Sequence, residues 1–242
     1  MKKQREKMEA FATELAGHLG TNLKSLILFG SAVRSDAQTP HSEMNLLLIV
    51  DDASTSSLRP IEPAISGWVK RREPAPLIFT EVEWRASTDV FPIEIEDMRE
   101  AHELLRGEDP FLDITTSQED LRRELEREVR GKLLQLRAEY VAVAPNGRDL
   151  TKLLLDSLGT FLILMRALAR LIGESPASDV SGLINQTAAA AGLDPNAFTW
   201  VVDKLSGRTV HALKAYDETG SRYVDEMEKL AKFVDEFTKK QS

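Results

Sequence analysis

The residues best suited to chemistry lie close together, within residues 25–52. Gly30 has no Cβ, so its backbone can turn sharply and let a ligand approach closely. Ser31 follows it and offers a hydroxyl and backbone N–H groups to an anion. Glu43 and Asn45 come next, and because strand side chains alternate between two faces, these two point the same way. The stretch therefore combines a candidate anion-binding turn with two oxygen-bearing side chains on one strand face.

Two short apolar runs position these residues. Leu26–Phe29 ends directly before Gly30, and Leu46–Val50 begins directly after Asn45. Both runs have the length of buried strands. The polar loop between them contains Pro40. The chain therefore predicts a strand, a tight turn, a loop and a second strand.

This order of an apolar strand, Gly30-Ser31, a polar loop and Glu43-Met44-Asn45 resembles the signature of the DNA polymerase β-like nucleotidyltransferase superfamily. The resemblance implies that the Gly-Ser segment holds a nucleoside triphosphate and that Glu43 and Asn45 occupy the two positions that bind Mg²⁺. It also implies an α/β (α+β) fold with a mixed sheet and flanking helices, and a third carboxylate on a later strand.

The stretch Phe91–Met98 supplies the candidate for that third carboxylate. Strand alternation places Ile93 and Ile95 on one face and Glu94 and Glu96 on the other. Glu94 is the first choice and Glu96 the second, and the alternative is that both are solvent-facing residues of a half-buried strand. The following Ala101–Gly107 is expected to form a brief helical turn. The sequence around both segments also resembles a subgroup of bacterial nucleotidyltransferase-like proteins.

The metal-binding positions depart from the family pattern. Three carboxylates would carry a charge of about −3 for two Mg²⁺ ions, whereas Glu43, Asn45 and Glu94 carry −1, 0 and −1. Asn45 keeps a carbonyl oxygen but cannot form an anionic bridge between two metals. Glu43 is one methylene longer than aspartate, and a shift of about 1 Å in a catalytic group can cost roughly a hundredfold in rate. The sequence therefore predicts transfer activity that is weak or lost.

Arg34, in the loop after Ser31, is the remaining candidate for binding the nucleotide. A planar guanidinium suits phosphate oxygens, and the family often has a basic residue near this place. The alternative is an ordinary solvated arginine, and the two interpretations have equal weight.

The composition excludes several classes of protein. The chain has 242 residues, a net charge of −8 and no cysteine. The acidic balance argues against a general nucleic-acid binder, and the missing cysteine excludes disulfides and thiol catalysis. The most apolar segment, Leu153–Leu171, is interrupted by Asp156 and Arg166 and is expected to be a buried helix rather than a membrane span. The charged N-terminus lacks the apolar centre of a signal peptide, so a cytoplasmic protein is expected.

Two domains are expected, a nucleotidyltransferase-like domain over residues 1–116 and an all-α bundle over residues 117–242. The change from strand-like to helical patterns near Ser117 sets this boundary. The remaining elements are read from apolar spacing, Gly and Pro. They are helices over residues 1–20, 60–70, 81–88, 117–140, 149–172, 180–191, 195–219 and 221–239, and a strand over 77–80. The bundle is also the expected surface for any oligomer.

Three functional interpretations remain open. The first is a nucleotidyltransferase that moves NMP, with AMP the first expectation, from an NTP to a small molecule or a protein. The second is a non-catalytic relative that binds a nucleotide or another phosphorylated ligand. The third is a protein-interaction module like those of toxin–antitoxin systems, and it rests on analogy alone. Loss of binding when Mg²⁺ is chelated would separate the first from the second.

Overall fold

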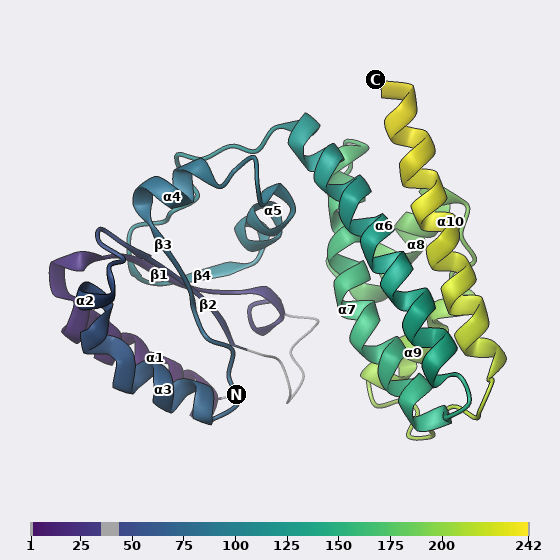
Figure 1. Ribbon diagram of the computed structural model, residues 1–242, viewed down its shortest axis with the longest axis horizontal. Helices are drawn as coiled ribbons and strands as arrows, with labels where there is room; N and C mark the ends of the chain where they lie inside the picture. Colours follow the sequence, from purple (N-terminus) through teal and green to yellow (C-terminus); the bar gives the residue numbers. More distant parts are fainter. Residues whose placement is uncertain (1, 35–43, 242) are drawn as a thin grey trace. The chain divides into compact units, whose positions relative to one another are not determined.

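The structure, a computed structural model, describes residues 2–34 and 44–241. It divides into two compact units, Met1–Ser117 (unit 1) and Gln118–Ser242 (unit 2). Unit 1 holds a sheet with helices, and unit 2 is helical (Figure 1). The elements of unit 1 are α1 (Lys2–Leu19), η1 (Gly20–Asn22), β1 (Leu23–Phe29), η2 (Gly30–Ala32), β2 (Asn45–Val50), α2 (Thr55–Leu58), η3 (Arg59–Ile61), α3 (Glu62–Lys70), β3 (Leu77–Thr80), α4 (Glu81–Ala86), α5 (Pro92–Glu100) and β4 (His102–Gly107).

The sheet of unit 1 has four strands in the order β3-β2-β1-β4. β1 lies antiparallel to both β2 and β4, and β2 lies parallel to β3. The prediction of a mixed sheet with flanking helices is confirmed. The register pairs Phe29 with Asn45, so the end of β1 lies beside the start of β2.

Helices cover both faces of the sheet, as Figure 1 shows. Alternate residues of β1 and β2, such as Leu26 and Leu48, pack with α1 and α3. The intervening residues, such as Ile27 and Leu47, pack with Trp84 of α4 and with α5. Because both faces are buried, the two central strands are continuously apolar rather than alternating.

The predicted elements over residues 91–107 are wrong. The expected strand Phe91–Met98 is the helix α5, and the expected helical turn Ala101–Gly107 is the strand β4. Pro92 occupies the first turn of α5, where a missing N–H costs nothing. β4 forms because β1 has a free edge with which it pairs, and that partner is distant in sequence. Glu94 and Glu96 therefore do not form a stripe along a strand.

Unit 2 consists of α6 (Gln118–Val143), α7 (Gly147–Leu171), α8 (Val180–Ala191), α9 (Asn196–Leu205) and α10 (Glu218–Gln241). α7 is the central element and packs against the other four. The apolar residues of α6 recur at spacings of three and four and are buried, as predicted. The buried positions are Leu121, Leu125, Val129, Leu133 and Leu136.

One helix of unit 2 is shorter than predicted. The expected helix 195–219 ends at Leu205, and Gly207 follows in a left-handed conformation with φ of 74°. Residues 206–217 then return without helical structure to α10, where Asp217 accepts a hydrogen bond from the N–H of Thr219. No helix in the described part of the chain has the length and apolar character needed to cross a membrane.

Candidate functional site

The turn at the end of β1 has the conformation that a close ligand approach requires. Gly30 has φ of 81°, a region that favours glycine. Its N–H donates to the carbonyl of Ala101 at 3.0 Å, and its own carbonyl accepts from the N–H groups of Val33 and Arg34. These bonds fix the turn from both sides. Within the described residues, the hydroxyl of Ser31 has no hydrogen-bond partner and is available to an anion.

Asn45 lies beside this turn. It is the first residue of β2 and pairs with Phe29. Its Nδ2 atom lies 3.5 Å from the point that a Cβ on Gly30 would occupy. The structure thus places Asn45 beside Gly30, and the roles predicted for Gly30, Ser31 and Asn45 stay predictions. Glu43, the other residue predicted to bind a metal on this strand, lies outside the described residues.

The two carboxylates predicted from residues 91–98 have other surroundings. Glu94 is exposed on α5. Glu96 accepts a hydrogen bond from Thr116 at 2.6 Å and pairs with Arg99 at 3.0 Å. The strand alternation that selected Glu94 is wrong, so its role as a metal ligand stays a prediction without a geometric basis.

A carboxylate that the sequence reasoning missed lies at the start of β2. Glu73 accepts a hydrogen bond from the N–H of Met44 through Oε2 at 3.3 Å, and it is partly buried. Because β2 and β3 are parallel, the segments that precede them meet at one end of the sheet. The available signal was the position of Glu73, four residues before the strand Leu77–Thr80.

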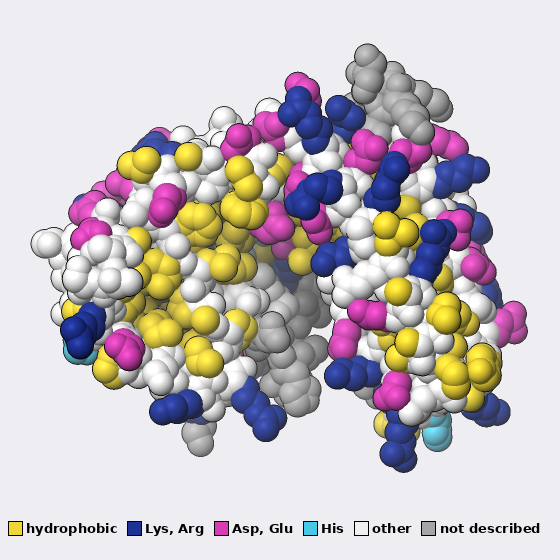
Figure 2. Space-filling view, in the orientation of Figure 1, with side chains coloured by type: hydrophobic (Ala, Val, Ile, Leu, Met, Phe, Trp, Pro, Cys, Tyr) yellow, Lys and Arg dark blue, Asp and Glu magenta, His cyan; other side chains and the backbone are white. Residues whose placement is uncertain are grey.

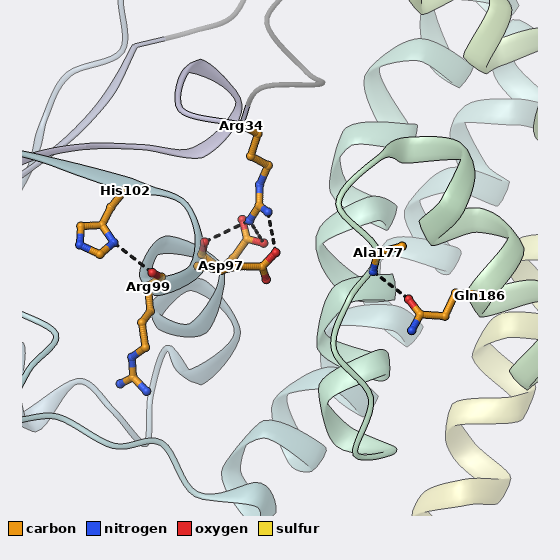
Figure 3. A network of polar contacts seen from close by, with 7 residues as sticks. Arg34, Asp97, Arg99, His102, Ala177 and Gln186 are labelled. Carbon is orange, nitrogen blue, oxygen red and sulfur yellow. Dashed lines mark hydrogen bonds and ion pairs between the residues drawn. The ribbon is translucent and has the colours of Figure 1, made fainter.

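Arg34 contacts α5 rather than open solvent (Figure 3). Its Nη2 lies 2.9 Å from Oδ1 of Asp97, and its Nη1 lies 2.8 Å from Oε1 of Glu100. The side chains of Arg34 and Asp97 are only 11% and 12% exposed. The guanidinium also donates to the backbone carbonyl of Asp97 at 3.2 Å. Since α5 occupies these donors, phosphate binding by Arg34 stays a prediction and would require their release.

The described donors do not fit the two Mg²⁺ ions that the resemblance implies. No three His, Cys, Asp or Glu side chains in the described residues lie close enough to hold a metal ion. Asn45 contributes a neutral amide, which cannot bridge two cations as a carboxylate does. We therefore derive no chemical step through a metal.

Unit 2 contains a groove of about 460 Å³ between α6 and α7. Its charged lining residues are Lys132, Glu139, Asp149, Lys152 and Asp156, and Ser157 and Thr160 add hydroxyls. Among the described residues, the side chains of Lys132, Asp149, Lys152 and Asp156 have no hydrogen-bond or ion-pair partner. By contrast, most arginines elsewhere on α6 pair with a neighbouring carboxylate.

Comparison with known proteins identifies the type of fold. The sequence matches no known protein-family profile and no curated protein. The structure is similar to the crystal structure of spectinomycin adenyltransferase AAD(9) from Enterococcus faecialis, solved with ATP and spectinomycin. The TM-score is 0.59 at 14% sequence identity, and the likeness covers 96% of this chain and 99% of that chain. The chain therefore has a nucleotidyltransferase-like fold over both units.

Proposed function

We propose that unit 1 binds a nucleoside triphosphate, ATP first, at the Gly30–Ser31 turn, and that the chain transfers AMP slowly to a small-molecule acceptor. The observation that carries this proposal is the conformation of Gly30 beside Asn45, within the fold of an adenyltransferase. That neighbouring protein was solved with ATP, which favours an adenine nucleotide as the ligand.

The residues of the turn suit phosphate oxygens. The Ser31 hydroxyl can donate to an anionic oxygen, and such charge-assisted hydrogen bonds are the stronger kind. The amide of Asn45 can donate a further hydrogen bond through Nδ2. Without a Cβ at Gly30, the backbone leaves room for the phosphate chain.

Glu73 can supply negative charge that Asn45 lacks. Its carboxylate lies at the start of β2 and is held by the N–H of Met44. We propose it, in place of Glu94, as the third acidic group of the site. It would accept the proton from the acceptor hydroxyl as a general base, while the acceptor oxygen bonds to the α-phosphorus of ATP and pyrophosphate leaves. A general base typically contributes about 10²- to 10⁴-fold in rate.

We propose separately that the α6–α7 groove of unit 2 binds a small molecule. Its volume lies within the range of small-molecule sites, roughly 300–1,000 Å³. Three carboxylates suit ammonium groups, and Ser157 and Thr160 suit hydroxyls. A ligand with both amine and hydroxyl groups fits this lining, and spectinomycin, which the neighbouring protein was solved with, is the first probe.

A second function is favoured by two specific observations. Asn45 has no charge for a metal, and Arg34 is occupied by Asp97 and Glu100. Both suit a protein that binds a nucleotide without transferring it. In that case binding persists when the divalent cation is removed.

Calorimetry with a non-hydrolysable ATP analogue tests the binding proposal. Titrations in Mg²⁺ and in EDTA use the full chain, the Ser31→Ala variant and, as matched control, Ser66→Ala on the exposed surface of α3. Saturable binding that Ser31→Ala weakens and Ser66→Ala leaves unchanged supports the site. Binding that needs Mg²⁺ favours transfer, and binding in EDTA favours the second function. Absence of binding in both buffers overturns both functions.

Transfer itself is measured with ATP labelled in the α-phosphate and spectinomycin as acceptor. Asn45→Asp restores the missing charge and is expected to raise the rate at least about tenfold if the site retains two-metal chemistry. Glu73→Gln is expected to lower the rate while leaving ATP binding intact. If Asn45→Asp binds the nucleotide and transfers no faster, the chain is a binding protein.

A further inference from the structure

The two outermost strands of the sheet differ in how their edges are protected. β4 carries Glu103, which pairs with Arg5 of α1 at 2.8 Å, and Arg106, which pairs with Glu9 of the same helix. Its pairing with β1 also shifts register between Leu26 and Ile27. Charged side chains and bulges are the devices by which proteins stop an edge strand from pairing with another chain.

β3 carries neither a charge nor a bulge. It is a short strand of four residues, Leu77-Ile78-Phe79-Thr80, and Pro76 directly precedes it. It pairs with β2 in an unbroken parallel register. An outermost strand of this kind presents backbone N–H and C=O groups that can template a further strand.

Exposed apolar side chains flank β3 on both faces of the sheet. Leu77 is 45% exposed and, because it pairs with Leu47, it lies on the face covered by α4 and α5. Val82 of α4 is 78% exposed, and Val69 of α3, which covers the other face, is 46% exposed. Figure 2 shows hydrophobic side chains gathered on unit 1 over the region where Figure 1 labels β3 and α4. The open edge is therefore apolar and uncharged along its length.

We propose that β3 pairs antiparallel with β3 of a second copy of this chain. The two four-stranded sheets then form one continuous eight-stranded sheet. The twofold axis runs perpendicular to the sheet beside Ile78 or Phe79, so that the same patch of each copy meets itself. Facing residues in an antiparallel pair share one side of the sheet. The helices α1 and α3 of both copies therefore lie on the same side.

The charges around β3 favour a second copy as its partner. Lys70, Arg71 and Arg72 precede the strand together with Glu73, whereas Glu81 and Glu83 follow it together with Arg85, which pairs with Glu81. The end before the strand is therefore net positive and the end after it net negative. Antiparallel pairing brings the basic end of one copy toward the acidic end of the other. A parallel partner strand with the same charges would place like charges together.

Sedimentation velocity over a concentration series from about 1 to 500 µM tests the proposal, since a short strand gives a small interface and weak association. The full chain of 27.0 kDa is expected to shift reversibly to twice that mass. Leu77→Lys places a charge on the edge and is expected to weaken dimerisation at least about tenfold. The matched control is Leu104→Lys on β4, where Leu104 is 41% exposed and lies on the opposite edge of the same sheet. It is expected to leave dimerisation unchanged, with circular dichroism confirming that both variants are folded.

Cysteine cross-linking gives a second readout, because the chain contains no cysteine of its own. With a bismaleimide linker that spans about 15 Å, Leu77→Cys is expected to form a covalent dimer, because the two Leu77 positions lie within about 14 Å of each other across the twofold axis, while Leu104→Cys stays monomeric. A chain that remains monomeric over the whole series overturns the proposal. Dimerisation that survives Leu77→Lys, or equal cross-linking of the two cysteine variants, also overturns it, because the contact would then lie elsewhere.

Discussion

The two units differ in how far their ion pairs are exposed to solvent. In unit 1, Arg34 is 11% exposed and forms its ion pair with the equally buried Asp97 beside the Gly30 turn. In unit 2, Arg123 of α6 is 61% exposed and pairs with Glu119 one turn earlier, which is 63% exposed. A surface pair contributes little to stability, whereas a buried pair costs much if one partner is lost. The difference indicates that α5 and the Gly30 turn hold each other in place, while the exposed pair within α6 contributes little to the stability of unit 2.

The largest expected effect comes from Arg34→Ala. The substitution removes the buried ion pair with Asp97, and we expect a loss of about 3 kcal/mol in the free energy of unfolding of unit 1. Urea unfolding followed by tryptophan fluorescence measures it in a Trp200→Phe background. That background keeps the signal in unit 1, from the buried Trp68 and Trp84.

Arg123→Ala is the matched control for this prediction, because both partners of its ion pair with Glu119 are exposed. Its side chain is exposed, so a change of no more than about 0.5 kcal/mol is expected. Circular dichroism, which reports the helices of unit 2, follows this variant. Similar losses for the two variants would remove the contrast between the units.

A smaller effect is expected from replacing glycines. Gly30→Ala meets no steric obstacle, because Asn45 lies at an ordinary contact distance of 3.5 Å. Its φ of 81° nevertheless costs about 1–2 kcal/mol for a residue with a Cβ. Gly159→Ala in α7 has open space around its Cβ and is expected to stabilise unit 2 by up to about 1 kcal/mol.

Stability changes of opposite sign for these two substitutions would strengthen the contrast between the strained turn of unit 1 and the regular helices of unit 2. Thermal unfolding of each variant gives the sign directly, and titration with the ATP analogue shows whether Gly30→Ala also weakens binding. If Gly30→Ala proves as stable as the unmodified chain, the turn is not held in the conformation described.

The elements that could be predicted from local sequence are those in which the apolar residues themselves form a clear pattern. The buried face of α6 and the apolar runs of β1 and β2 needed no information from distant residues. Residues 91–107 needed information from distant residues. Ile93-Glu94-Ile95-Glu96 alternates like a strand, although Pro92 begins a helix there. β4 is a strand only because β1 offers it an edge 73 residues away, between Phe29 and His102. Long-range pairing outweighed the local pattern.

In the candidate site too, some residues could be placed from local sequence and others only from long-range pairing. Gly30, Ser31 and Asn45 are close in sequence or joined by one hairpin, and the structure brings them together. Glu73 reaches Met44 only through the parallel pairing of β2 and β3, which the sequence did not reveal. The ion pair of Arg34 with Asp97 likewise joins segments that are distant in sequence. Local motifs therefore located the turn but not the acidic groups around it.

The smallest effect is expected at a buried neutral pair in unit 2. The hydroxyl of Tyr223 lies 3.0 Å from Oγ of Ser157, and the ring is fully buried. Tyr223→Phe removes this hydrogen bond and is expected to cost about 1 kcal/mol at pH 7. This is less than the loss expected for Arg34→Ala, because no buried ion pair is removed.

The same residue gives a pH dependence of known sign. Burial raises the pKa of the Tyr223 hydroxyl above its ordinary value of 10.0. Below pH 10 the hydroxyl is protonated in both folded and unfolded chains, so its contribution is fully present. As the pH rises above 10, only the unfolded chain releases this proton, and stability falls. Urea midpoints between pH 8 and pH 11, followed by circular dichroism, should therefore fall more steeply for the unmodified chain than for Tyr223→Phe. Equal slopes would mean that the hydroxyl reaches solvent, and the apolar interior of unit 2 would then be less sealed than the described contacts indicate.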